Sequence, residues 1–292
     1  MAQQIPVDPG AHAPDIEASD HLHVVAHDIA YKRLAIVNAA FIGAADVGDR
    51  GWVLVDAGMP GTAGAIRRAA AERFGERARP SAIVLTHGHA DHIGAVLDLS
   101  HAWDVPVYAH HLEAPYLDGR ASYPPPDAGV GGGLMSVVAK LFPRGPINLG
   151  ARLHALPANG TVPPLPEWRW VHTPGHTPGH VSLFRPADRV LIAGDAFITT
   201  AQESVYAVAT QREELHGPPM YYTQDWHAAA ASVRRLDALA PELAVTGHGH
   251  AMRGPAMREA LSRLARNFEQ VAVPRDGRYV ANPTTPDHGA YQ

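Results

Sequence analysis

The chain has 292 residues, of which 46% are hydrophobic and 18% are charged, a composition typical of a folded protein and not of a disordered one. A formal net charge of −5 provides no overall field that would draw the protein to nucleic acid or to an anionic membrane. Cysteine is absent, which excludes disulfides, a thiolate nucleophile and cysteine metal ligands. Any metal site must therefore be built from carboxylates and from the 19 histidines.

Residues 1–20 are predicted to form a flexible N-terminal arm or an irregular lead-in, because three prolines and a glycine lie among polar residues. This segment has neither the basic start nor the apolar core of a secretory signal. No run of about eighteen apolar residues occurs, so no transmembrane helix is predicted. We expect a cytoplasmic enzyme in which residues 21–292 form a single domain.

Between residues 22 and 109, predicted strands and helices alternate as in a layered α/β protein. Short apolar runs predict strands, and an Ala- and Arg-rich segment that ends at Gly75 predicts the first helix. The predicted strands are 22–26 and 34–42 (a hairpin), 52–55, 81–85 and 106–109, with helices at 62–74 and 93–103.

Residues 112–166 interrupt this alternation and are predicted to be a lid-like insertion. The segment contains three consecutive prolines at 124–126, three glycines at 131–133, and an apolar stretch from Leu134 to Phe142. A long irregular segment inside a compact domain is usually a lid or a binding loop. A surface insertion with a short docked helix remains the alternative.

Strand and helix patterns resume after residue 166. The same β-rich then α-helical order returns, which predicts a core of two sheets covered by helices on both outer faces. The predicted strands are 168–172, 181–184, 190–193 and 243–246, with helices at about 225–239 and 255–268.

The strongest chemical signal is the segment T-H-G-H-A-D-H-I-G at residues 86–94, between a predicted strand and a predicted helix. His87 and His89 are alternate residues, and the turn that follows the strand lets their side chains converge on one point. Asp91 and His92, at the start of the helix, can face an adjacent point. Imidazole nitrogen suits zinc and similar ions, so this spacing predicts two neighbouring metal centres.

Further ligands are predicted at other strand ends. The loop T-P-G-H-T-P-G-H at residues 173–180 presents His176 between two strands. Asp195 ends an apolar strand, and His248 follows another. Each segment is a weak signal alone, but four such segments in order form a specific one.

In this order, the motifs resemble those of the metallo-β-lactamase superfamily, with a similarity that extends from about residue 22 to 268. The resemblance implies an α/β (α+β) fold, the four-layer αβ/βα sandwich, with the active site along one edge of the two sheets. It also implies two metal sites bridged by Asp195. The first would be held by His87, His89 and His176, and the second by Asp91, His92 and His248.

Three more residues lie close to these motifs. Asp56 matches a position near the site in many members of the superfamily, and we expect it to contact a ligand. His180 and His250 are expected to support the site or the fold and not to bind metal directly. His172, near the third motif, is left unassigned.

This ligand set predicts hydrolysis, in which a metal-bridging hydroxide attacks the substrate. Asp91 is predicted to pass a proton to the leaving group in addition to binding metal. We expect two divalent ions, with Zn²⁺ preferred and Mn²⁺ or Fe²⁺ as alternatives.

The substrate is predicted to be a carboxylic ester, lactone or thioester. The true β-lactamases of the superfamily have cysteine or serine where this chain has Asp195, so β-lactams are not expected. The P-G-H-T-P-G-H loop resembles the lactonase and glyoxalase II branches. Two departures are notable: Ile198 stands where quorum-signal lactonases have tyrosine, and the basic glutathione-binding domain of glyoxalase II is not evident.

Other functions stay open at this stage. The same metal site could hydrolyse phosphodiesters or phosphotriesters, although the acidic charge argues against a nuclease. Iron-based redox chemistry and a non-catalytic binding role are less favoured, the latter because no ligand is missing. We expect a small-molecule substrate and neither nucleic acid nor a membrane as partner; the sequence is compatible with a homodimer as well as with a monomer.

Overall fold

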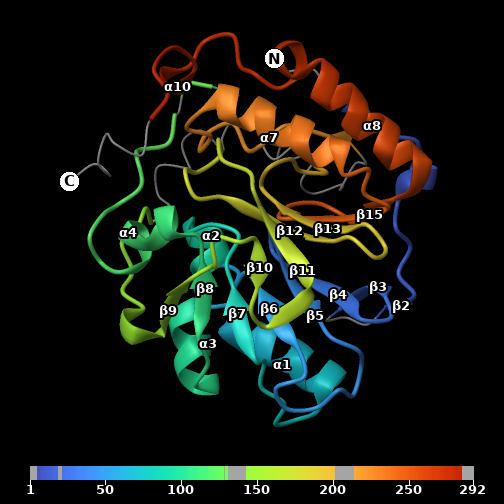
Figure 1. The fold of residues 1–292 in the computed structure, drawn as a ribbon, viewed down its shortest axis with the longest axis vertical. Helices are drawn as coiled ribbons and strands as arrows, with labels where there is room; N and C mark the ends of the chain where they lie inside the picture. Colours follow the sequence, from blue (N-terminus) through green and yellow to red (C-terminus); the bar gives the residue numbers. More distant parts are fainter. Residues whose placement is uncertain (1–4, 19–21, 128, 131–142, 201–213, 285–292) are drawn as a thin grey trace.

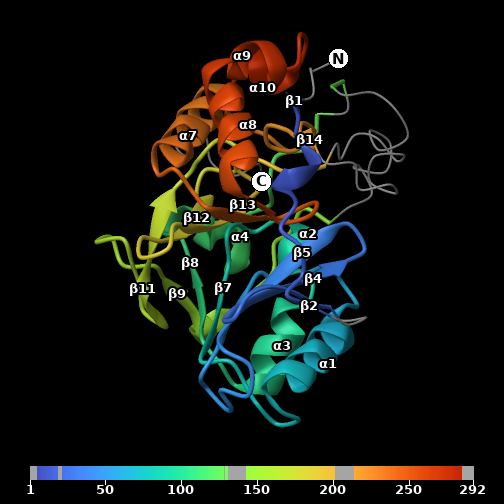
Figure 2. The same ribbon diagram turned by 90° about the vertical axis from the view of Figure 1, so that its right-hand side faces the viewer.

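The structure is a computed structural model that describes residues 5–18, 22–127, 129–130, 143–200 and 214–284. Two β-sheets face each other, and helices cover the outer side of each sheet (Figure 1). Turning the molecule by 90° shows the same layers, with α1 (Ala63–Phe74) and α3 (Val96–Trp103) on one side and α7 (Trp226–Ala238) and α8 (Gly254–Arg266) on the other (Figure 2).

The first sheet has eight strands, which follow one another in space in chain order. Neighbours are antiparallel up to β6 and parallel from β6 to β9. The strands are β2 (Glu17–Ala18), β3 (His23–Ala26), β4 (Ile29–Leu34), β5 (Val37–Ile42), β6 (Val53–Val55), β7 (Ala82–Val84), β8 (Val107–Ala109) and β9 (Leu153–Ala155).

The second sheet has six strands among the described residues; β13 pairs with β15 in parallel, and the other neighbouring strands pair antiparallel. The strands are β10 (Thr161–Val162), β11 (Leu165–His172), β12 (Val181–Arg185), β13 (Val190–Gly194), β15 (Leu243–Thr246) and β16 (Met252–Arg253). A separate two-stranded ladder pairs β1 (Ile5–Pro6) with β14 (Glu214–Leu215).

Among the described residues, four long helices form the outer layers, and short helices fill the connections. The long ones are α1 (Ala63–Phe74), α3 (Val96–Trp103), α7 (Trp226–Ala238) and α8 (Gly254–Arg266). The short ones are η1 (Pro9–Ala11), α2 (Ala90–Ile93), η2 (His111–Glu113), α4 (Ala114–Leu117), η4 (Gly150–Arg152), α9 (Phe268–Val271) and α10 (Arg278–Ala281).

Strand side chains alternate between two cores, as the pleat requires. In β13, Ile192 enters the core between the sheets, whereas Leu191 packs under α7 and α8. In β6, Val55 faces the inter-sheet core and Leu54 packs under α1 and α3. Continuous apolar runs in both strands thus reflect sheets that are buried on both faces. The predicted four-layer αβ/βα sandwich is confirmed.

The N-terminal segment packs against the domain in the part that the structure describes. Ile5, Val7 and Ala11 are buried in the core under α8, and Ala13 is buried between the sheets. The prolines of this segment indicated a loop. The apolar residues between them are nevertheless buried against the domain.

Some predicted strand and helix boundaries also differ from those of the structure. A turn at Ala35, which has a positive φ of 63°, divides the predicted strand 34–42, so a three-strand meander replaces the hairpin. The predicted helix 93–103 is interrupted after Ile93 and continues as α3. The segment 112–166 supplies the edge strands β9 and β10, so part of it belongs to the sandwich. Its apolar stretch at 134–142 lies outside the described residues.

Within the described ranges, no helix is both long and apolar enough to cross a membrane.

Shortening a side chain of the inter-sheet core should destabilise the protein. Leu183 is fully buried there and pairs with Ile192 across the ladder. We expect Leu183→Ala to lower the free energy of unfolding by about 2–5 kcal/mol, because it removes buried methyl groups and leaves a cavity. Urea unfolding of the metal-free protein measures this. The control Ile16→Ala, at a side chain that is 64% exposed, should change stability by less than about 0.5 kcal/mol. Equal losses in both variants would contradict this account of the core.

Candidate metal centre

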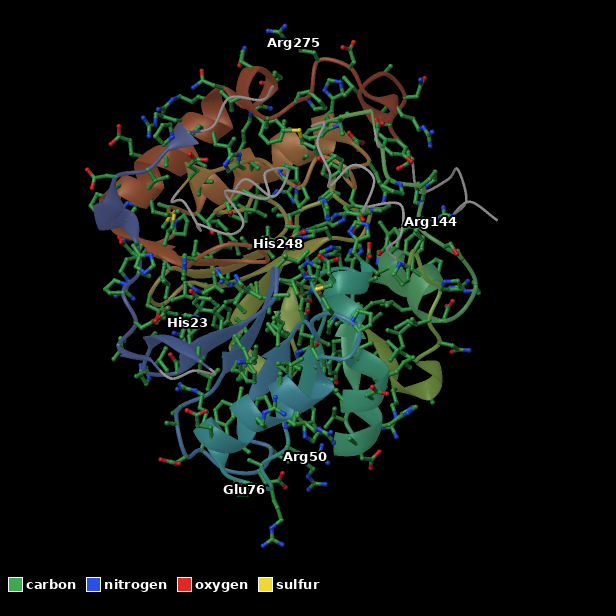
Figure 3. The ribbon with its side chains drawn as sticks, turned by 180° about the vertical axis from the view of Figure 1, so that it is seen from behind. His23, Arg50, Glu76, Arg144, His248 and Arg275 are labelled. Carbon is green, nitrogen blue, oxygen red and sulfur yellow. The ribbon has the colours of Figure 1, made fainter. Side chains whose placement is uncertain are left out.

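Four strand ends converge on one place at the edge of the sandwich. His87 lies beyond the end of β7, and His176 lies in the loop between β11 and β12. Asp195 directly follows β13, and His248 lies beyond the end of β15. Figure 3 shows His248 near the middle of the molecule, between the half that carries Glu76 and the half that carries Arg275.

All seven residues predicted as ligands meet there. Their ligand atoms form three groups in which every atom lies within 4.8 Å of the others. The groups are His87, His89 and His176; His87, His92 and Asp195; and Asp91, His92 and His248. The first and third match the two predicted ion sites, and the second links them.

Distances within the cluster place Asp195 at its centre. Its Oδ2 lies 3.2 Å from His248 Nε2, 3.4 Å from His176 Nε2 and 3.5 Å from His92 Nε2. Asp91 Oδ2 is 3.5 Å from His248 Nε2 and 3.8 Å from His92 Nε2. One carboxylate therefore contacts members of both predicted ion sites.

Several buried polar atoms in this cluster lack the partners that a folded protein normally provides. His87 Nε2, His92 Nε2 and Asp195 Oδ1 are buried and have no hydrogen-bond partner within the described chain. His89 Nδ1 and His176 Nε2 approach to 2.9 Å, as two nitrogens aimed at a common point would. Each unpaired buried group costs about 1–3 kcal/mol, a cost that coordination to a cation would remove. The residues present therefore fit a pair of bound metal ions.

Hydrogen bonds at the other ring nitrogen fix how these imidazoles point. His92 Nδ1 donates to Asp56 Oδ2 at 2.8 Å, and His248 Nδ1 donates to the carbonyl oxygen of Ile36 at 2.6 Å. His176 Nδ1 lies 3.3 Å from the Thr223 hydroxyl. In all three residues Nε2 is left for a metal, the arrangement that metal-binding histidines usually show.

Asp56 reaches the site from the end of β6. Its two carboxylate oxygens accept hydrogen bonds from the amide and the hydroxyl of Thr86, each at 2.8 Å, as well as from His92. It thereby ties the first histidine motif to the neighbouring strand. This placement agrees with the expectation that Asp56 contacts a ligand.

Burial keeps one set of the imidazoles neutral, which is the form that binds metal. Burial, with smaller contributions from neighbouring imidazoles, holds the pKa of His87 and of His176 well below the usual value. Burial also lowers the pKa of His89 to about 4.

The imidazoles nearest the carboxylates behave in the opposite way. Burial lowers the pKa of His92, but the charges of Asp195, Asp91 and Asp56 outweigh it, so the net pKa lies well above the usual value. Burial likewise lowers the pKa of His248, but Asp195 and Asp91 outweigh it, so the net pKa is raised. Burial raises the pKa of Asp195, yet His248 and His92 bring it well below the usual value. The neighbouring carboxylates therefore favour the protonated form of these two imidazoles when no cation is bound.

Comparison with known proteins agrees with this geometry. The family model described as "Metallo-beta-lactamase superfamily" matches residues 33–248. The chain belongs to the metallo-β-lactamase superfamily. The matched range contains every residue of the cluster, from Asp56 to His248.

Among similar proteins of the superfamily, "Probable metallo-hydrolase YflN" of Bacillus subtilis (strain 168) is 50% identical over 220 residues, which cover 75% of this chain and 83% of that one. The chain is accordingly a metallo-hydrolase. A crystal structure of TTHA1623 in a di-iron-bound form is 26% identical and covers 81% of this chain and 96% of its own, with a TM-score of 0.50. The BLEG-1 B3 metallo-beta-lactamase (24% identity, 89% and 96% coverage, TM-score 0.53) shares the fold.

The remaining histidines discussed from the sequence have supporting positions. His180 Nε2 accepts the backbone N–H of Asp195 at 2.9 Å, and its Nδ1 lies 2.8 Å from the Thr173 hydroxyl. His250 instead lies near Tyr31, 3.4 Å from its hydroxyl. His172 Nε2 donates to the carbonyl oxygen of Pro178 at 2.9 Å. None of these three belongs to the ligand groups found among the described residues.

Two residues of the centre's surroundings were missed in the sequence. Glu113 is fully buried and accepts hydrogen bonds from both histidine-bearing loops, and the Tyr123 hydroxyl donates to it. Burial raises the pKa of this carboxyl group above its usual value, although four hydrogen bonds oppose that effect. Both lie in the segment interpreted as an insertion, and no local pattern distinguishes them from surface residues.

Close packing behind Asp195 predicts that Gly247 cannot carry a side chain. A Cβ there would lie 2.0 Å from Asp195 Oδ1 and 2.8 Å from His92 Cε1. We expect Gly247→Ala to displace Asp195 and to lose most of the bound metal, because the bridging ligand can no longer reach both sites. Metal content after loading and gel filtration measures this.

The matched control is Gly64→Ala in α1, where the nearest atom to the new Cβ is Arg68 Nη1 at an ordinary 3.5 Å. It should retain the metal content of the unsubstituted protein. Full metal content in the Gly247→Ala protein would show that Asp195 does not hold the ions in this position.

Proposed function

We propose that this metallo-hydrolase uses two divalent ions to hydrolyse a carboxylic ester, a lactone or a thioester. The observation that carries the proposal is the position of Asp195, whose carboxylate contacts ligands of both ion sites. His87, His89 and His176 would hold one ion, Asp91, His92 and His248 the other, and Asp195 both. When bound, such ions supply Lewis acidity, which lowers the pKa of water and polarises a substrate oxygen.

The proposal assigns separate tasks to the chain's own carboxylates. Asp195 is buried and held by His180 through its backbone, which suits a fixed ligand. The side chain of Asp91 is 17% exposed, against 2% for Asp195, so it can meet a substrate. We assign Asp91 the transfer of a proton to the leaving group, because a partly exposed carboxyl group beside the ligands is within reach of it. Asp56 keeps His92 oriented.

The surroundings of His89 support a carbonyl substrate with an apolar part. The half-buried ring of Tyr222 lies beside His89, with ring centroids 5.2 Å apart, and gives the site an aromatic wall. Binding sites for small organic molecules commonly combine aromatic walls with a few polar groups. Asp195, in place of the cysteine or serine of true β-lactamases, argues against β-lactams.

Zinc is the ion we propose, because a set of imidazoles and carboxylates suits it. Iron is the competing choice, since the similar TTHA1623 has been crystallised in a di-iron-bound form. Manganese accepts the same donors. Metal analysis of protein purified without added metal discriminates among the three.

Hydrolysis tested across substrate classes checks the proposed reaction. The zinc-loaded protein is assayed by proton release against lactones, aryl esters, thioesters and phosphoesters. We expect turnover of at least one carbonyl class, and Asp195→Ala should reduce it by about a thousandfold or more, because both ion sites lose a shared ligand. The control Asp104→Ala removes a carboxylate that is 78% exposed and should keep activity within about twofold.

The outcomes separate the alternatives. Turnover of phosphoesters alone would leave the metal centre intact and overturn the substrate class. Iron-dependent oxidation without hydrolysis of any member of the panel would overturn the proposed reaction. Equal activity in the Asp195→Ala protein would overturn the role of the shared carboxylate.

A further inference from the structure

Glu113, at the end of η2, is a fully buried acidic residue outside the seven proposed ligands. Burying a carboxylate is costly unless hydrogen bonds satisfy it. Here each of its oxygens accepts two hydrogen bonds. Oε1 accepts the Thr177 hydroxyl at 2.9 Å and the Gly179 amide at 2.7 Å, while Oε2 accepts the Gly88 amide at 2.9 Å and the Tyr123 hydroxyl.

These donors belong to two separate loops of the metal centre. Gly88 stands between His87 and His89, Thr177 directly follows His176, and Gly179 comes two residues later. The loops are about ninety residues apart in the sequence and meet at this carboxylate, so Oε2 fixes the first loop and Oε1 the second. Together the two loops carry all three ligands of the first ion site.

The backbone of the two loops packs so closely against Glu113 and Tyr123 that a side chain at either glycine would displace a neighbour. A Cβ at Gly179 would lie 2.7 Å from Glu113 Cγ, and a Cβ at Gly88 would lie 2.7 Å from the Tyr123 hydroxyl. Neither glycine has the positive φ that would itself favour glycine. Glycine is therefore required at both positions for reasons of space, because Glu113 packs against Gly179 and Tyr123 packs against Gly88.

Tyr123 extends the same contact to a ligand side chain. Its hydroxyl accepts the Gly88 amide at 3.0 Å and donates to Glu113. Its ring stacks on Tyr116, with centroids 3.7 Å apart, and also lies 4.6 Å from the ring of His89. The position of His89 is thus coupled to Glu113 through both backbone and side chain.

We propose that Glu113 is a positioning residue, which holds the His87–His89 loop and the His176 loop at the separation that the first metal ion requires. This inference rests on the metal centre of the proposed function. It assigns to a carboxylate that binds no metal the task of preorganising three imidazoles that do. Partners of this kind outside the ligand set change metal affinity by about 10–100-fold in other proteins.

The two-oxygen arrangement makes Glu113→Gln a specific test. Glutamine has nearly the same size but only one acceptor oxygen, and its NH₂ group donates. Whichever way the amide turns, its NH₂ faces a backbone N–H of one of the two loops, so that loop loses its amide hydrogen bond to residue 113. A side chain that merely filled space would tolerate this change.

The experiment measures Zn²⁺ affinity by competition with a chelating dye, and the absorption spectrum of the Co²⁺-loaded protein. For Glu113→Gln we expect about tenfold or greater loss of affinity at the first site and an altered Co²⁺ spectrum. The matched control is Asp127→Asn, which alters another buried carboxylate. Asp127 accepts the backbone amides of Gly129 and Arg278, away from the ligand loops, and the control should bind Zn²⁺ as the unsubstituted protein does.

A second variant keeps the proposal testable if Glu113→Gln does not fold. Thr177→Val removes a single donor from the His176 loop and preserves the shape of the side chain. It should weaken Zn²⁺ binding several-fold. Unchanged affinity in the folded variants, or an equal loss in Asp127→Asn, would overturn the role of Glu113. An unsubstituted protein that binds no metal would instead overturn the proposed function itself.

Discussion

The buried carboxylate of Asp195 is the group on which the centre depends. Its Oδ2 contacts three imidazoles, those of His92, His176 and His248, while its Oδ1 is buried without a hydrogen-bond partner in the described chain. A buried anion needs opposite charge close by. The fold supplies it by ending parallel strands of both sheets at one edge, so residues far apart in sequence surround a single oxygen. Cations bridged there would satisfy both oxygens and the unpaired nitrogens of His87 and His92 together.

Close packing and a set of outer hydrogen bonds keep this arrangement in place. Gly194 and Gly247 leave room for Asp195 and its neighbours: a Cβ at Gly194 would come within 2.6 Å of His180 Nε2. Asp56 orients His92, and Glu113 joins the two histidine loops. Carboxylates thus act at two levels, some on the proposed ions and others on the groups that hold them. Such preorganisation lets a metal site form without rearranging the chain.

Local sequence patterns predicted the elements whose positions depend on nearby residues. Helix α1 was placed to within one residue, because an Ala-rich segment ends at Gly75, and apolar runs located β6, β7, β13 and β15. The seven clustered residues were predicted because spacing and strand ends identify them.

Tertiary contacts account for what was missed. Packing of Ile5 and Val7 under α8 depends on residues some 250 positions away, and Glu113 has no neighbour in sequence that indicates its role. The turn at Ala35 requires a positive φ that alanine seldom adopts.

The central claim is that two ions share Asp195, and diffraction at the zinc absorption edge from crystals of the zinc-loaded protein tests it most directly. The account predicts two anomalous peaks, one bounded by His87, His89 and His176 and the other by Asp91, His92 and His248, with Asp195 in contact with both. A single peak, or peaks that Asp195 does not contact, would contradict it.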